Sequence, residues 1–179
     1  GAETYTFDLG STTGLTRMEF ASGTIDTNTV VIDSYTSGTT IQLGTTIAAA
    51  VQEFGGSLDV NMVNSAGTAD ELNVRLQDTE DGVLGDIDAA GIETTNLVLT
   101  TDATNHNVNL AGIAPTLGST GTINISGGVS TDGITVTAVA AGVTTIDAST
   151  LSGTFTLSDR GSAAMTITGG TAADSLRME

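Results

Sequence analysis

The sequence predicts an all-β protein built as a right-handed parallel β-solenoid, a β-helix or β-roll with about 21 to 26 residues per coil. Apolar positions recur every 21 residues in the last third of the 179-residue chain. Each interval holds two short segments in which apolar and polar residues alternate, which is the pattern of strands. Aromatic residues make up 3% of the chain, whereas glycine fills 23 positions. Small aliphatic side chains in thin layers therefore form the expected core.

The repeat is clearest when residues 121–141, 142–162 and 163–179 are aligned beneath one another. Three apolar columns result: Ile125, Ile146 and Ile167; Ile134, Phe155 and Leu176; and Val136, Leu157 and Met178. Two strands cannot bury an apolar face alone, but stacked coils can, because each pairs with the next at about 4.8 Å.

Earlier segments extend the stack. Leu97 and Leu99 followed by Val108 and Leu110 repeat the same internal offsets, and Leu72, Val74 and Val83 indicate another coil. We therefore expect a solenoid of about five coils over residues 66–179.

Residues 1–65 are predicted to form a small, irregular capping region. Segments 4–9, 30–33, 39–43 and 57–63 have the composition of strands. Residues 45–54 (TTIAAAVQEF) predict the one helix, ended by Gly55 and Gly56. This helix is expected to cover the open end of the stack, where unpaired backbone would be exposed. The first residues show no initiator Met or signal peptide, so we expect a fragment of a larger protein.

The charge limits the possible partners. The chain has 21 acidic and 4 basic residues and a formal net charge of -17, which disfavours nucleic acids and anionic membranes and favours cations. The absence of cysteine excludes disulfides, thiolate zinc sites and cysteine catalysis. No apolar run reaches the ~18 residues of a membrane span.

Two turns of the repeat share the pattern G-G-x-x-x-D-x-[I/L], at residues 127–134 and 169–176. Aligned turn positions carry Asp81, His106, Asp132, Gly153 and Asp174. Residues 78–88 form the densest acidic stretch, and carboxylates this close repel one another unless a cation lies between them. A solvated acidic loop is the alternative. The candidate calcium ligands are Asp78, Glu80, Asp81, Asp86, Asp88, Asp132 and Asp174.

These turns resemble the nonapeptide of the RTX family of secreted calcium-binding repeat proteins, with Ser130 and Ala172 in place of its third glycine. Segments 67–74, 91–97 and 143–149 precede a closing turn in the same order as in bacterial surface-layer (S-layer) proteins of the Caulobacter and Campylobacter type, which leave the cell by type I secretion. The resemblance implies an extracellular, cell-surface structural protein that forms a lattice of its own copies and depends on Ca²⁺. It also implies a secretion signal beyond Glu179, and surface polysaccharide is a further expected partner.

Catalysis is not expected. His106 is the only imidazole, no G-x-S-x-G motif surrounds a serine, and aromatic residues that could hold a sugar are scarce. Two alternatives remain open: a stalk segment of a secreted RTX adhesin or enzyme, and an ice-binding solenoid. Thr-x-Thr pairs suggest the latter, but only Thr135 and Thr156 share a column and Arg177 follows them, so β-propensity is the favoured explanation.

Overall fold

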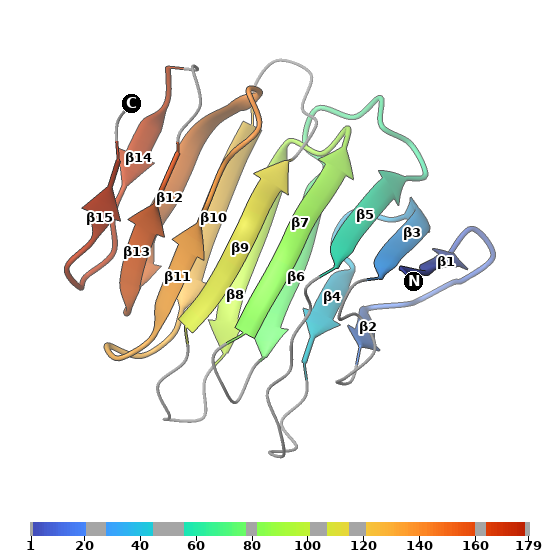
Figure 1. The fold of residues 1–179 in the computed structure, drawn as a ribbon. Helices are drawn as coiled ribbons and strands as arrows, with labels where there is room; N and C mark the ends of the chain where they lie inside the picture. Colours follow the sequence, from blue (N-terminus) through green and yellow to red (C-terminus); the bar gives the residue numbers. More distant parts are fainter. Residues whose placement is uncertain are drawn as a thin grey trace.

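The computed structural model describes residues 2–20, 28–44, 56–77, 82–100, 107–114, 121–159 and 164–177. These residues form parallel strands that alternate between two sheets along the chain, as in a solenoid. Figure 1 shows the coils stacked side by side, with the N-terminus at one end and the C-terminus at the other. The predicted β-solenoid is thus confirmed.

One sheet has eight strands, all with odd numbers. They are β1 (Thr4–Asp8), β3 (Thr29–Tyr35), β5 (Ser57–Met62), β7 (Gly82–Ala90), β9 (Asn107–Ala114), β11 (Gly133–Val136), β13 (Thr154–Leu157) and β15 (Ser175–Leu176). The other sheet has seven strands, all with even numbers. They are β2 (Arg17–Phe20), β4 (Thr40–Leu43), β6 (Glu71–Gln77), β8 (Thr94–Thr100), β10 (Gly121–Gly127), β12 (Val143–Leu151) and β14 (Thr166–Thr168).

A layer of mainly aliphatic side chains, joined by Tyr35 and Phe155, lies between the sheets. In β8, for example, Thr95, Leu97 and Leu99 are buried, whereas the residues between them are half-buried on the outer face. This alternation follows from the two-residue period of a strand. Each coil therefore contributes one thin section to a continuous core.

The strands before residue 66 belong to the same two sheets. β4 pairs with β6, and β5 pairs with β7, so the hydrogen-bonded sheets cross the predicted boundary between residues 65 and 66. Four of these strands coincide with predicted segments, whereas β2, with the sequence RMEF, was not predicted. The predicted helix at 45–54 lies outside the described residues.

Hydrogen bonds of the Tyr35 side chain link these early coils. Its side chain is fully buried, and its hydroxyl donates to the carbonyl of Thr39, while the carbonyl oxygen of Glu71 lies 3.2 Å from the same hydroxyl. The same oxygen accepts the Asn73 amide N–H at 3.4 Å. Burial raises the pKa of this phenol to about 12, so it remains a neutral donor at physiological pH.

The register confirms one step of each predicted column and corrects others. Ile146 pairs with Ile167, as predicted. Ile134 pairs with Phe155, and Val136 with Leu157, as predicted. Ile146, however, lies opposite Ile123 and not Ile125, because the offset there is 23 residues and β12 contains a register shift. Leu176 lies opposite Leu157 and not Phe155. Coils that differ in length shift the columns, which a strict 21-residue alignment cannot represent.

Candidate functional site

The predicted calcium turn between β10 and β11 uses its carboxylate internally. Asp132 is 1% exposed, and its Oδ2 accepts the amide N–H of Val129 at 2.7 Å. The Asp132 amide in turn donates to the Val129 carbonyl at 2.9 Å. The side chain therefore closes its own turn, a common use of Asp in loops.

The second predicted turn, between β14 and β15, is similar. Asp174 Oδ1 accepts the amide N–H of Phe155 at 2.8 Å. Its Oδ2 lies so close to Gly169 that a Cβ there would come within 2.1 Å. In both turns a glycine leaves room for the carboxylate, but Asp132 accepts an amide of its own turn, whereas Asp174 accepts one from β13.

The predicted acidic stretch is only partly described. Asp78, Glu80 and Asp81 lie outside the described residues, as does His106. Asp86 and Asp88 lie on β7, separated by the buried Ile87, and Asp86 is the more exposed of the two. Among the residues with a described position, no group of three or more His, Cys, Asp or Glu side chains is arranged to hold a metal ion.

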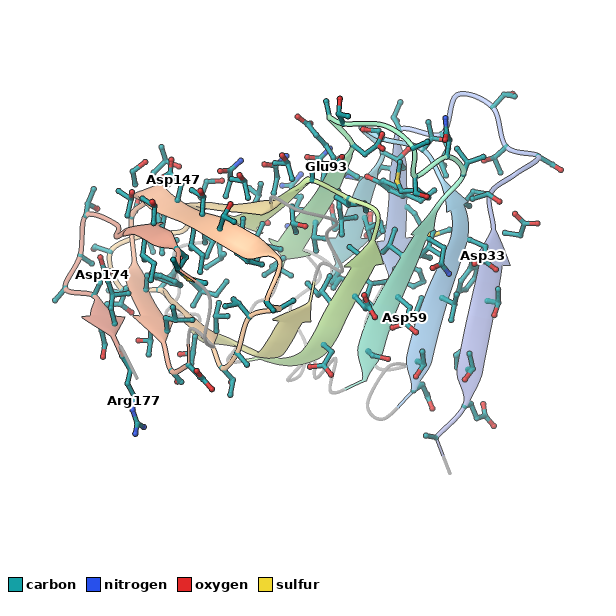
Figure 2. All side chains as sticks on the ribbon, turned by 90° about the horizontal axis from the view of Figure 1, so that it is seen from above. Asp33, Asp59, Glu93, Asp147, Asp174 and Arg177 are labelled. Carbon is teal, nitrogen blue, oxygen red and sulfur yellow. The ribbon has the colours of Figure 1, made fainter. Side chains whose placement is uncertain are left out.

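The strand pairing places other carboxylates around these two. Asp88 lies opposite Asp59 of β5, and Asp33 of β3 lies opposite Asp8 of β1. Asn61 Nδ2 donates to Asp33 Oδ1 at 2.8 Å. We call this group on the outside of the eight-stranded sheet the acidic face; it consists of Asp8, Asp33, Asp59, Asp86 and Asp88. Figure 2 labels Asp33 and Asp59 on their neighbouring strands.

Neighbouring carboxylates of the acidic face affect the pKa of Asp59. Burial, and then the nearby charge of Asp88, raises the pKa of Asp59, while Asp86 adds to the effect. Sequence reasoning identified Asp86 and Asp88 but missed the pairing of Asp88 with Asp59. The two-residue spacing of Asp59 and Asn61 matches that of Asp86 and Asp88, but it would set Asp59 opposite Asp86, so the spacing does not give the observed register.

The outer face of the seven-stranded sheet has a different chemistry. Thr94, Thr122, Thr145 and Thr166 lie opposite one another on β8, β10, β12 and β14. Two residues further along the same strands, a second row contains Asn96, Asn124, Asp147 and Thr168. We call these two rows the hydroxyl-amide face. This face appears only in the observed register, because a strict 21-residue alignment would place Thr145 opposite Asn124 instead of Thr122.

An asparagine ladder links this face to the earlier coils. Asn96 Nδ2 donates to Asn73 Oδ1, and Asn124 Nδ2 donates to Asn96 Oδ1, both at 2.8 Å. Asp147 continues the row, where hydrogen bonds from the side chain and amide of Ser149 lower its pKa. Figure 2 shows Asp147 on one side of the coils and Arg177 pointing away from the other. The row fixes the coils to one another and leaves hydroxyl and amide groups on the outside.

No protein-family model, curated protein or solved structure matches this chain. Over the described ranges, the structure contains no helix with the length and apolar character needed to cross a membrane.

Proposed function

We propose that the chain is a non-enzymatic structural module of an extracellular bacterial surface protein, of the S-layer and RTX type suggested by its sequence. The observation that carries the proposal is the continuity of the stack. One apolar core and one asparagine ladder pass from coil to coil, so the module forms a rod whose outer surfaces repeat. A repeating rod is suited to spanning distance and to packing against copies of itself.

Calcium has a specific place in this proposal. One carboxylate oxygen of Asp132 and one of Asp174 already accept backbone amides, so these two turns offer fewer side-chain oxygens to a cation than an exposed carboxylate does. We place the calcium instead on the acidic face and the acidic stretch of residues 78–88. There Ca²⁺ would neutralise carboxylates whose charge, after burial, raises the pKa of Asp59.

Thermal unfolding tests this placement. Millimolar Ca²⁺ is expected to raise the melting temperature, because a ligand held a hundredfold above its Kd stabilises the folded state by about 2.7 kcal/mol. Mg²⁺ at the same ionic strength should do much less, since it keeps its water shell. The double variant Asp86→Asn and Asp88→Asn should lose most of the gain, whereas Asp174→Asn should retain it. The opposite result would place the calcium site in the RTX-like turns that carry Asp132 and Asp174. A melting temperature unchanged by Ca²⁺ and by EDTA would contradict calcium binding.

Self-assembly tests the structural role. Electron microscopy of the purified chain with Ca²⁺ is expected to show ordered rods or sheets that dissolve in EDTA. A chain that stays monomeric at every concentration with Ca²⁺ would favour a stalk segment of an adhesin or enzyme over a lattice component.

The hydroxyl-amide face supports a second candidate, the ice-binding solenoid. Its two rows across four adjacent strands form a regular polar array with a spacing of about 4.8 Å between strands. Inhibition of ice recrystallisation should then be lost in Thr122→Lys and Thr145→Lys, and kept in the control Thr135→Lys on the other sheet. A wild-type chain that leaves ice crystals to coarsen would exclude this candidate.

A further inference from the structure

The end of the stack formed by β1 and β2 exposes the core layer that the inner coils bury. Tyr5 and Phe7 of β1 lie opposite Val30 and Ile32, which are buried, so both aromatic residues occupy core positions of the sheet. They are nevertheless 40% and 39% exposed. Among the described residues, β1 pairs only with β3 and β2 only with β4, so one edge of each strand has no strand beside it.

This open layer differs in composition from the inner core. Met18 and Phe20 of β2, both half-buried, complete it from the other sheet, and the rings of Phe7 and Phe20 pack edge to face with centroids 5.5 Å apart. We call Tyr5, Phe7, Met18 and Phe20 the end layer. It holds three of the six aromatic residues of the chain, whereas the inner core is mainly aliphatic. Aromatic residues and methionine are enriched at the centres of protein interfaces.

The path of the chain limits how a second copy can cover the end layer. The strands of one sheet run opposite to those of the other, as the arrows of β6 and β7 show in Figure 1. Each coil advances by one strand spacing, so β2 lies about half a spacing further along the stack than β1. A head-to-tail copy that paired β15 with β1 would therefore leave room for a missing strand between β14 and β2.

A two-fold axis parallel to the strands removes this mismatch. It places β2 of the second copy beside β1, and β1 of the second copy beside β2, each antiparallel and one strand spacing away. Both sheets then continue without a gap. We propose that the end layer binds the end layer of a second copy in this way, as a two-fold symmetric dimer. Such an interface is self-complementary, because the same surface serves both subunits.

The aromatic rings lie where this dimer needs apolar contacts. Rotation about an axis parallel to the strands leaves each residue at its own height along them. Phe7 and Phe20, which pack together within one copy, therefore meet the same two residues of the other copy at one level. The free edges of β1 and β2 gain backbone partners at the same time. The dimer deepens the assembly proposed above by naming the faces at which two copies meet, but it needs neither calcium nor a cell surface.

The charges beside the end layer predict how the dimer responds to salt. Glu3 and Asp8 are exposed carboxylates. Arg17 is already matched by Glu19 at 3.0 Å. The rims of both copies are therefore negative, and salt screens their repulsion. Added NaCl should strengthen the dimer, whereas an interface held by ion pairs would weaken.

Analytical ultracentrifugation of the chain in EDTA tests the proposal. We expect a reversible monomer–dimer equilibrium that NaCl shifts toward the dimer, and X-ray scattering should show a dimer about twice as long as the monomer, because the stacks join end to end. Phe7→Ser and Tyr5→Asp should each raise the Kd of the dimer at least about tenfold. Leu176→Ser is the matched control, since Leu176 is 38% exposed at the opposite end of the stack, and it should leave the Kd unchanged.

Four results would overturn the assignment: a chain that is monomeric at every concentration, equal effects of Phe7→Ser and Leu176→Ser, a dimer that NaCl weakens, or a compact dimer in which the copies lie side by side. Melting temperatures identify any loss that comes from unfolding, and Tyr5→Asp keeps the test decisive if Phe7→Ser unfolds. Because the assay contains no calcium, its failure leaves a calcium-dependent lattice standing, and failure of the lattice leaves the dimer standing.

Discussion

At the scale of single residues, the carboxylates divide into those that bond the backbone and those that repel one another. Asp132 and Asp174 belong to the first kind, and Asp59 belongs to the second. Sequence alone identifies an acidic residue before a strand, but it does not show whether the carboxylate turns toward its own loop or toward solvent. This explains why the predicted calcium turns have a structural use that the spacing did not indicate.

Asp59 provides a test of the repulsion. Its pKa is raised in the folded state, so the folded chain holds this proton more tightly than the unfolded chain does. The carboxyl therefore favours folding below its ordinary pKa of 3.8, and this contribution is lost as the pH rises through the raised folded-state pKa. Asp59→Asn should increase the free energy of unfolding by about 0.5 kcal/mol at neutral pH.

Urea unfolding at neutral and acidic pH measures this effect. The gain should disappear at acidic pH, where the wild-type carboxyl is protonated. Asp33→Asn is the control, since Asp33 accepts a hydrogen bond from Asn61 and should give no comparable gain. If Asp59→Asn leaves the free energy of unfolding at neutral pH unchanged or lowers it, the charge of Asp88 does not destabilise the folded chain at this position.

At the scale of single elements, the ends of the strands depend on glycines that fit against the next coil. Gly127 ends β10 with φ of 86°, and a Cβ there would come within 2.1 Å of the Leu99 carbonyl oxygen. Gly38 has a similar φ of 88°, but nothing lies within 4 Å of where its Cβ would be. Comparing substitutions at Gly38 and Gly127 therefore separates the stability lost to a left-handed backbone conformation from the stability lost to a steric clash.

Gly38→Ala should cost about 1 kcal/mol of stability, the usual penalty for a left-handed alanine. Gly127→Ala should cost clearly more, because its methyl group also collides with the neighbouring backbone. Chemical denaturation of both variants gives the comparison. Equal losses would show that coils β8 and β10 do not approach as closely as described.

The asparagine ladder gives a second stability prediction at the scale of single elements. Asn96 both donates and accepts within the ladder, whereas Asn124 only donates in it. Each hydrogen bond contributes about 0.5–1.5 kcal/mol. Asn96→Ala should therefore destabilise the chain about twice as much as Asn124→Ala in equilibrium unfolding, and a smaller loss for Asn96→Ala would contradict a continuous ladder.

At the scale of the whole molecule, the fold was largely predictable and the register was not. The alternation of apolar residues indicated strands, and their repeat indicated a stack. The pairing of Ile123 with Ile146 depends on a register shift in β12, and the paired Asp59 and Asp88 depend on how β5 meets β7. Such offsets arise from corner lengths and packing between distant segments, which local periodicity does not encode. The hydroxyl-amide face could be assembled only once the register was known.

The register is therefore the central claim, and disulfide trapping tests it most directly, since the chain contains no cysteine of its own. Thr122 lies opposite Thr145, which places their Cα atoms about 4.8 Å apart, within the range that a disulfide can bridge. Asn124 lies one diagonal step away from Thr145, at about 7–8 Å. On mild oxidation, the pair Thr122→Cys and Thr145→Cys is expected to cross-link rapidly, while Asn124→Cys and Thr145→Cys should remain reduced. Preferential cross-linking of the second pair would restore the 21-residue register and contradict the arrangement of the hydroxyl-amide face.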